Sequence, residues 1–186
     1  MTQKTEDYTR VSEILAIFQA YAHVDRKLLK KAQDTGTSIH GAIESYFKDE
    51  FIPLDARRAP YFESFLSWAD SLHPIPIASE TRLYDHSLRI TGQFDLIATL
   101  GGEPYLIDFK TGSWEHPEIW EMQMTLYRYL MGVNGMPKPD KFMIVQLKKD
   151  GSPPKIFDFT FSQECLSACM SALDCYLWFR KALVSN

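Results

Sequence analysis

Residues 91–110 predict a β-hairpin in the middle of the chain, and this hairpin restricts the fold more than any other segment. Residues 91–100 and 103–110 read as strands, and Gly101 and Gly102 between them suit a two-residue turn. With these glycines at the turn, Asp95 lies directly opposite Asp108. Residues paired in this way have Cβ atoms about 4.5 to 5.5 Å apart. The hairpin therefore brings two carboxylates together on one face.

Two like charges directly opposite one another destabilise a sheet unless something positive lies between them. A hard divalent cation is the natural partner of paired carboxylates. Lys110 points to the same side as Asp108, because residues two apart in a strand share a face. Ile107 and Phe109 point the other way, into the expected core. The sequence thus predicts a cluster of acids, metal and lysine on one side of the hairpin and packing on the other.

Further motifs accompany the hairpin in a definite order. They are His40 after Gly36, Gly92-x-x-Asp95, Asp108-Phe109-Lys110 and Gln123-x-x-x-Tyr127. In this respect the chain resembles the RecB-like branch of the PD-(D/E)xK nuclease superfamily, from about residue 36 to residue 127. The resemblance implies an α/β fold of the restriction-endonuclease-like kind, with an αβββαβ core, a central mixed sheet and added N- and C-terminal helices.

The resemblance also implies a metal centre. In the family, the acids that correspond to Asp95 and Asp108 bind one or two Mg²⁺ or Mn²⁺ ions, helped by a backbone carbonyl at the position of Phe109. Oxygen ligands suit these hard ions. Lys110 is expected beside the attacking water or the scissile phosphate, where its charge assists the attack. The alternative is that the two acids are surface residues neutralised by Lys110 or Arg89.

Other site residues follow from the same resemblance. His40 is expected to contribute to the metal site, although a lone histidine beside an apolar helix stripe is more often a core residue. Glu80 is either a further ligand, of the metal or of a metal-bound water, or a solvent-facing strand residue. Gln123 is expected to position the lysine or the substrate phosphate, and Tyr127 to meet DNA. Trp114 either stacks on a base or covers the core.

The apolar periodicity predicts helices at about residues 10–21, 24–33, 37–49, 56–72, 117–132 and 162–183. Strands are expected at about 77–85, 88–100, 104–110, 141–147 and 155–161. A length of 186 residues suits one domain over 1–186. Within it, we expect residues 1–35 to be an N-terminal helical addition, residues 36–160 the core and residues 161–186 a C-terminal helix.

The start of the chain is polar, and no apolar run is long enough to span a bilayer. A cytoplasmic protein without a membrane partner is therefore expected, in the host cytoplasm if the chain is phage-encoded. The cysteines are Cys165, Cys169 and Cys175, an odd number that argues against a disulfide framework. Some RecB-like nucleases hold an iron–sulfur cluster with one upstream and three C-terminal cysteines. Here the upstream cysteine is absent and Cys175 points away on the helix, so we expect packing residues and no cluster.

The formal net charge is −4, which by itself does not favour a nucleic-acid partner. Phosphate binding depends on local positive charge, however. The basic segments are Arg26-Lys27 with Lys30-Lys31, Arg57-Arg58, and Lys148-Lys149. Each is either a solvated face or a contact with DNA.

These observations favour a metal-dependent deoxyribonuclease that hydrolyses phosphodiester bonds, with DNA as its partner. Small free-standing RecB-like domains resemble phage proteins that trim DNA ends, so the expectation is an exonuclease of recombination or repair. The alternatives are an inactive nuclease-fold subunit that binds DNA or protein, and a hydrolase of small phosphate esters. The sequence leaves open whether the chain forms a homo-oligomer or binds a recombination protein.

Overall fold

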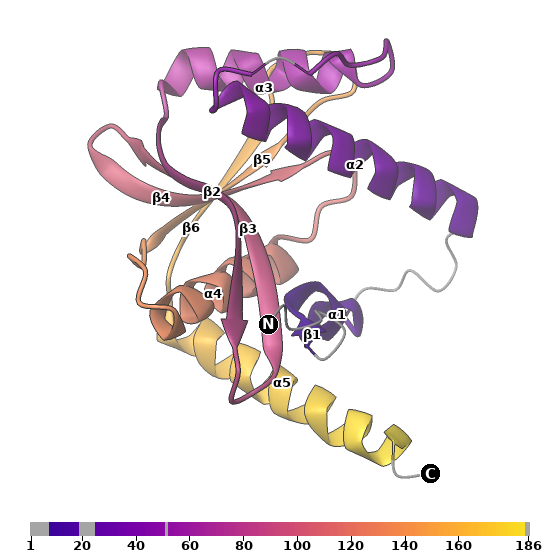
Figure 1. Ribbon diagram of the computed structural model, residues 1–186, viewed down its shortest axis with the longest axis vertical. Coiled ribbons are helices and arrows are strands. Elements are labelled where there is room, and N and C mark those ends of the chain that lie inside the picture. The colour runs from indigo at the N-terminus through magenta and orange to yellow at the C-terminus, as the bar shows by residue number, and fades with distance from the viewer. Residues whose placement is uncertain (1–7, 19–24, 51, 185–186) are drawn as a thin grey trace.

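The computed structural model describes residues 8–18, 25–50 and 52–184. A mixed six-stranded sheet lies between two layers of helices (Figure 1). In chain order the elements are β1 (Thr9–Arg10), α1 (Val11–Ala16), α2 (Arg26–Tyr46), α3 (Ala59–Leu72), β2 (Ile75–Asp85), β3 (Ile90–Leu100), β4 (Glu103–Lys110), α4 (Pro117–Val133), β5 (Lys141–Gln146), β6 (Lys155–Thr160) and α5 (Gln163–Val184). The expected α/β class and the αβββαβ core with added terminal helices are confirmed.

The predicted hairpin forms in the predicted register. Leu96 pairs with Ile107 and Leu100 pairs with Glu103. Gly101 and Gly102 have φ values of 57° and 89°, the positive values that a tight hairpin turn of this length requires. The ladder ends at the pair of Leu96 and Ile107, so Asp95 and Asp108 lie one step beyond the last paired residues. The expected direct pairing of the two aspartates is therefore not part of the ladder.

Strand β3 is paired along one side with the antiparallel strand β2. On its other side it pairs with two different strands. Near its start, Ile90 and Thr91 pair with the parallel strand β1, and from Leu96 onward it pairs with β4. Among the described residues, no strand pairs with residues 92–95 on this side, so the sheet has a gap there.

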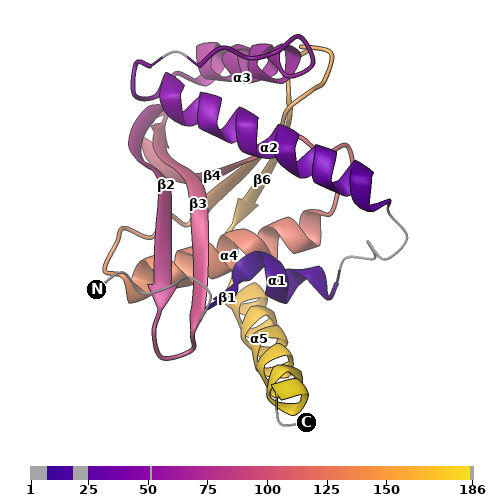
Figure 2. The ribbon, with the colours of Figure 1, turned by 45° about the vertical axis from the view of Figure 1, so that its right-hand side comes forward.

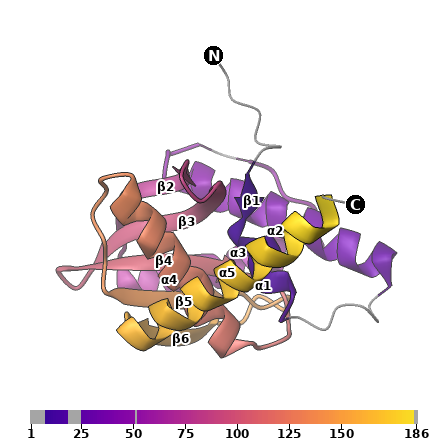
Figure 3. The same cartoon turned by 90° about the horizontal axis from the view of Figure 1, so that it is seen from below.

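Helices cover both faces of the sheet, as Figure 2 shows. Helices α2 and α3 pack on one face, in a cluster that includes Ile39, Phe65 and Trp68. Helix α4 packs on the other face, in a cluster that includes Phe94 and Leu130. Helix α5 packs on α4 on that side, and α1 lies beside α4 in contact with β3 (Figure 3). Both sides of the sheet are therefore buried, not one side as the alternation of the hairpin suggested.

Helix α2 differs from the sequence prediction. Two helices separated near Gly36 were expected, but one helix runs from Arg26 to Tyr46. A glycine inside a helix costs only about 1 kcal/mol relative to alanine, and burial of Ile39 and Ile43 offsets that cost. The expected boundary at residue 35 therefore falls inside a continuous helix.

The remaining elements agree with the sequence except in three places. Strand β1 was not predicted. The helix predicted at about 10–21 ends at Ala16 and is followed by a turn, and its predicted end at 19–21 lies outside the described residues. Strand β2 starts at Ile75 and contains Pro76, with a register shift between Pro76 and Ala78. Among the described helices, none combines the length and apolar character needed to cross a membrane.

Candidate active site

A pocket of about 440 Å³ lies at the end of the sheet, where the gap beside β3 opens between α2 and α4. It collects residues from α2, β3, β4, the segment after β4, and α4. Its lining residues are Ala32, Gln33, His40, Asp95, Asp108, Phe109, Lys110, Thr111, Gly112, Gln123 and Tyr127. The structure thus brings together most of the residues that the sequence singled out, although they span much of the chain.

Asp95 lies where β3 is distorted. Phe94 packs on the α4 side and Leu96 on the α2 side, although residues two apart in a regular strand share a face. The position across from Asp95 in the β2 register is Glu80, which has a φ of 45°. Such a φ is uncommon for residues other than glycine and costs about 1 to 3 kcal/mol. Asp95 and Asp108 both line the pocket, as expected, and Asp95 does so from a locally distorted part of its strand.

The carboxylate of Asp95 is held from two sides. Oδ2 accepts a hydrogen bond of 2.8 Å from the backbone N–H of Phe109, and Oδ1 lies 3.1 Å from Nδ1 of His40. Burial by itself raises the pKa of Asp95, but the positive charges of His40 and Lys110 outweigh it and lower the pKa below its ordinary value. Asp95 is therefore ionised near neutral pH.

His40 links Asp95 to a second carboxylate. Its Nδ1 is 3.7 Å from Oε1 of Glu80, whose Oε2 accepts a 2.5 Å hydrogen bond from Gln93. Burial by itself lowers the pKa of His40, but the Asp95 carboxylate, with a smaller contribution from Glu80, raises it well above its ordinary value. Ligand atoms of His40, Glu80 and Asp95 all lie within 4.8 Å of one another. Glu80 was expected to be either a further ligand or a solvent-facing strand residue. The structure places it beside His40 and Asp95.

Asp108 is almost fully buried, with 3% of its side chain exposed. Its Oδ2 lies 2.7 Å from Nζ of Lys110 in an ion-pair contact, but it has no hydrogen bond of acceptable geometry. Burial raises the pKa of Asp108 to about 6, with a contribution from Asp95 and against the opposing charge of Lys110. One buried oxygen is thus left without a hydrogen bond, which is costly unless another group binds it.

Gln123 of α4 joins the lysine to the acid. Its Oε1 accepts a 2.9 Å hydrogen bond from Lys110, and its Nε2 donates 2.9 Å to Oδ1 of Asp108. The same Nε2 is 3.0 Å from the hydroxyl of Tyr127, one helical turn later. The expected link between the glutamine and the lysine is present in the structure.

Tyr127 is 7% exposed and lies against the backbone of Gly92. A Cβ atom at position 92 would be 2.8 Å from Cε1 of Tyr127, closer than side chains tolerate. Gly92 therefore leaves the space that Tyr127 occupies, which explains why a glycine precedes Asp95 in the motif.

Of the two interpretations of Trp114, coverage of the core is wrong. Trp114 is 60% exposed, so it does not cover the core, and it does not line the pocket. It lies in the segment between β4 and α4 with its ring 6.5 Å from that of His116. Gln33 and Gln93 were not singled out, although Gln93 precedes Asp95 by two residues and so could have been noted as its neighbour on the strand.

The cysteines lie on α5 at a distance from the pocket in the chain and do not line it. Cys169 is buried and Cys165 half-buried, and both pack against the core cluster on the α4 side. Cys175 is exposed, so the interpretation of it as a packing residue is wrong. Its different orientation from Cys169 agrees with the helical geometry that was expected.

The donor atoms of the pocket fit a hard divalent cation. The clustered ligand atoms are carboxylate oxygens of Glu80 and Asp95 and an imidazole nitrogen of His40, with no thiol among them. Asp108 lines the pocket with His40 and Asp95 but is not a member of that group of three. Mg²⁺ and Mn²⁺ prefer such ligands. The unsatisfied Oδ2 of Asp108 is an additional buried acceptor that a cation would satisfy. His40 would need to lose its proton before it could act as a ligand.

Comparisons with known proteins agree with this geometry. Residues 53–164 match the family model of the PD-(D/E)XK nuclease superfamily. The "Putative exonuclease" from Eubacterium rectale superposes with a TM-score of 0.59 at 13% identity, over 95% of this chain and 84% of its own. An alkaline exonuclease from Laribacter hongkongensis has a TM-score of 0.51 at 12% identity, over 96% and 90%. No curated protein matches the chain in sequence. At such identities the structural likeness concerns the fold alone.

Proposed function

The chain belongs to the PD-(D/E)XK nuclease superfamily, and we propose that it is a metal-dependent deoxyribonuclease that removes nucleotides from DNA ends. One observation carries the proposal. Asp95, Asp108, Lys110 and Gln123 converge in a single pocket, where Gln123 joins Lys110 to Asp108 by hydrogen bonds. A fold alone does not define an activity, but this arrangement has the parts that phosphodiester hydrolysis requires.

Asp95 and Asp108 would hold the cation, with His40, Glu80 or the carbonyl of Phe109 as further ligands. When bound, Mg²⁺ or Mn²⁺ supplies Lewis-acid stabilisation of the phosphate and lowers the pKa of a coordinated water. The hydrogen bond from the Phe109 N–H fixes the orientation of the Asp95 carboxylate before any ligand arrives. Such preorganisation reduces the cost of assembling the site.

Lys110 is the group in the pocket that can donate to a phosphate oxygen or orient a water. Its Nζ has three N–H donors, and the hydrogen bond to Gln123 uses one of them, while Asp108 Oδ2 lies 2.7 Å away as an ion-pair partner. Donor capacity therefore remains for the substrate or the attacking water. Gln123 therefore acts as a positioning residue, because its carbonyl oxygen holds the ammonium group in place.

The exonuclease mode is the finer part of the proposal. It is supported by the exonuclease names of both structural relatives, each of which matches nearly the whole of this chain in fold. A role in the recombination or repair of DNA ends, as in phage proteins of this kind, is part of the same proposal. Tyr127 is assigned to the pocket wall near the substrate, and Trp114 to its exposed approach.

The test compares end-labelled linear DNA with closed circular DNA of the same sequence. With Mn²⁺, we expect the linear substrate to be degraded and the circular one to remain intact, and with chelator neither should be cut. Lys110→Met is the matched control, because it removes the donor and leaves the acids. Equal cleavage of both substrates would contradict the exonuclease mode, and no cleavage of either would contradict the nuclease proposal.

A further inference from the structure

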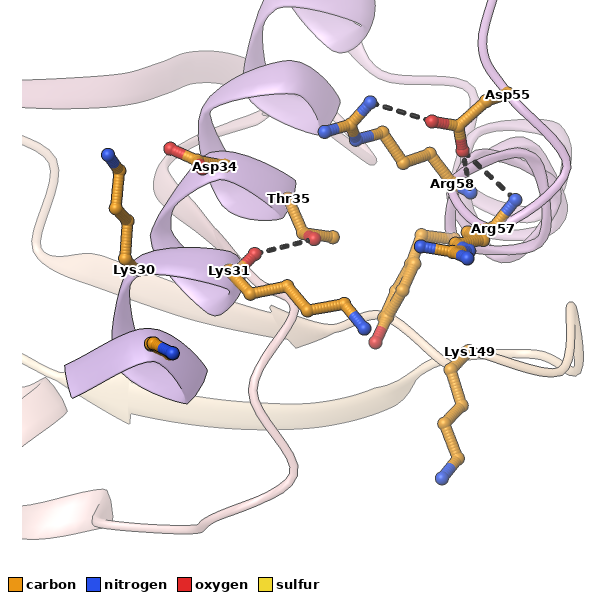
Figure 4. Close-up of a pocket in the computed structure, with 10 residues that line it drawn as sticks. Lys30, Lys31, Asp34, Thr35, Asp55, Arg57, Arg58 and Lys149 are labelled. Carbon is orange, nitrogen blue, oxygen red and sulfur yellow. Dashed lines mark hydrogen bonds and ion pairs between the residues drawn. The ribbon is translucent and has the colours of Figure 1, made fainter. Parts of the chain in front are cut away.

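A second hollow, the basic groove, lies beside α2 (Figure 4). It has a volume of about 530 Å³ and is formed by the N-terminal half of α2, the connection from α2 to α3 with the start of α3, and the connection from β5 to β6. Its basic residues are Lys27, Lys30, Lys31, Arg57, Arg58 and Lys149. Asp34 and Asp55 are its acidic residues. Three separate segments thus contribute positive charge to one hollow.

This concentration runs against the composition of the chain. The whole sequence has 20 basic and 24 acidic residues. The basic groove reverses the balance, with six basic residues against two acidic ones. A local positive patch on a chain of negative net charge attracts anions to that place and not to the surface as a whole.

Most of the positive charge is available to a ligand. Arg58 pairs with Asp55 at 2.8 Å, which fixes the connection before α3. Within the part of the chain that the structure describes, Lys30, Lys31, Arg57 and Lys149 have no carboxylate within ion-pair distance. Figure 4 shows Lys31 extending from α2 toward the side of the groove where Arg57 lies.

Helix α2 is the common wall of the groove and the active-site pocket. Gln33 and His40 line the pocket, whereas Lys31 and Thr35 line the groove. Lys31 and His40 are nine residues apart in one continuous helix, which is about 13 Å along the axis at a rise of about 1.5 Å per residue and about two and a half turns around it. Successive phosphates along a B-form strand are about 3.4 Å apart in projection, so a strand that reaches both sites spans at least about four nucleotides.

We propose that the basic groove binds backbone phosphates of the DNA strand, at least about four nucleotides from the phosphodiester in the active site. That the bound strand is DNA rests on the proposed function. Recognition is by charge, so it does not depend on base sequence. Tyr61, half-buried in the wall of the groove, offers an aromatic face to a base.

Binding measured in chelator tests the groove without requiring cleavage. A fluorescent single-stranded oligonucleotide of twelve nucleotides is titrated with the parent and with a Lys31→Gln/Arg57→Gln double variant. The matched control is Lys138→Gln/Lys141→Gln, which removes the same charge outside the groove. Release of counterions predicts about a fivefold loss of affinity per lost phosphate contact at 0.1 M salt. The double variant should therefore bind about 25-fold more weakly, and the control within about twofold of the parent.

The salt dependence gives a second readout. The slope of log affinity against log salt should fall by about 1.4 in the double variant, because each single-strand phosphate contact contributes about 0.7. Single variants Lys31→Gln and Arg57→Gln should each show about half of that change. If the double variant does not fold, these single variants still test the groove.

Two results would overturn the inference. One is equal binding by the groove variants and the control, which includes the case in which the parent does not bind the oligonucleotide. The other is competition by polyglutamate as effective per charge as by DNA, which would make an acidic peptide the ligand. If the groove variants lose binding but the parent cuts no DNA with any metal, the groove stands and the proposed nuclease activity fails.

Discussion

At the scale of single residues, Gln123 has a chemistry that no charged side chain could replace. It must accept a hydrogen bond from Lys110 and donate one to Asp108. A carboxylate could do only the first, and an ammonium group only the second. The side-chain amide does both, and these two hydrogen bonds define which end of it carries the oxygen and which the nitrogen. The glutamine of the motif is therefore explained by the two different groups that it joins.

This account predicts the effect of Gln123→Glu. The change loses the donor to Asp108 and adds a like charge beside it, so we expect activity to fall about 10- to 100-fold, as for other groups that orient metal ligands. Gln33→Glu is the control, because it adds the same charge at an exposed position of the same pocket. Steady-state rates on linear DNA with Mn²⁺ provide the measurement. Equal losses in the two variants would mean that added charge alone accounts for the effect.

Asp108 gives a prediction for the stability of the metal-free protein. Burial raises its pKa to about 6 from an ordinary value of 3.8, so the folded state favours the protonated acid. The stabilisation is complete below pH 3.8 and is lost as the pH rises through about 6. The raised pKa of His40 changes the stability only above pH 6.5, and the lowered pKa of Asp95 changes it only below pH 3.8. The range from pH 4 to pH 6 therefore reports on Asp108.

In chelator, we expect the free energy of unfolding of the parent to fall across this range by an amount on the order of 2 kcal/mol. Asp108→Asn should remove most of that fall and should be at least as stable as the parent at pH 7. Asp158→Asn, at an exposed site on β6, should keep the parent's slope. Urea unfolding at several pH values measures all three. If Asp108→Asn is less stable than the parent throughout, Asp108 serves a structural pair with Lys110 instead.

At the scale of elements, the contact between β3 and α4 holds the polar network in place. Gly92 lies in β3 and Tyr127 in α4, and the space between them has no room for a side chain. Gly92→Ala should lower the free energy of unfolding by about 1 to 3 kcal/mol through overpacking. It should also reduce the cleavage rate, because Gln123 is bonded to the displaced Tyr127 hydroxyl.

The control for this prediction is Gly41→Ala on α2. No atom lies within 4 Å of a Cβ at position 41, and alanine is the better helix former, so stability should rise by up to about 1 kcal/mol. Thermal and urea unfolding of both variants give the comparison. A Gly92→Ala protein as stable and active as the parent would mean that this contact does not support the site.

Local sequence patterns predicted some of these elements and not others. The hairpin and its register were predictable, because Gly101 and Gly102 determine the pairing of neighbouring segments. The unbroken helix through Gly36 was not, because tertiary packing outweighed the local preference of one glycine. Strand β1 pairs with residues about 80 positions away, so no local pattern indicated it.

At the scale of the whole molecule, the resemblance in motifs identified which residues meet, and the fold explains how they meet. The gap beside β3 admits side chains from α2 and α4 to the same pocket. The sequence noted Lys30-Lys31 and Arg57-Arg58 as separate basic segments. Their convergence in the basic groove required the positions of α2 and α3, which no single segment specifies.

The central claim is that Asp95 and Asp108 form the metal-dependent centre of a nuclease. Its most direct test is the single-turnover rate of cleavage of labelled linear DNA with saturating Mn²⁺. Asp95→Asn and Asp108→Asn should each reduce this rate at least about 1,000-fold, because a catalytic metal contributes several kcal/mol to the stabilisation of the transition state. The exposed control Asp158→Asn should cleave like the parent, and chelator should abolish cleavage by both. A rate within about tenfold of the parent in either site variant, or equal cleavage in chelator, would contradict the account.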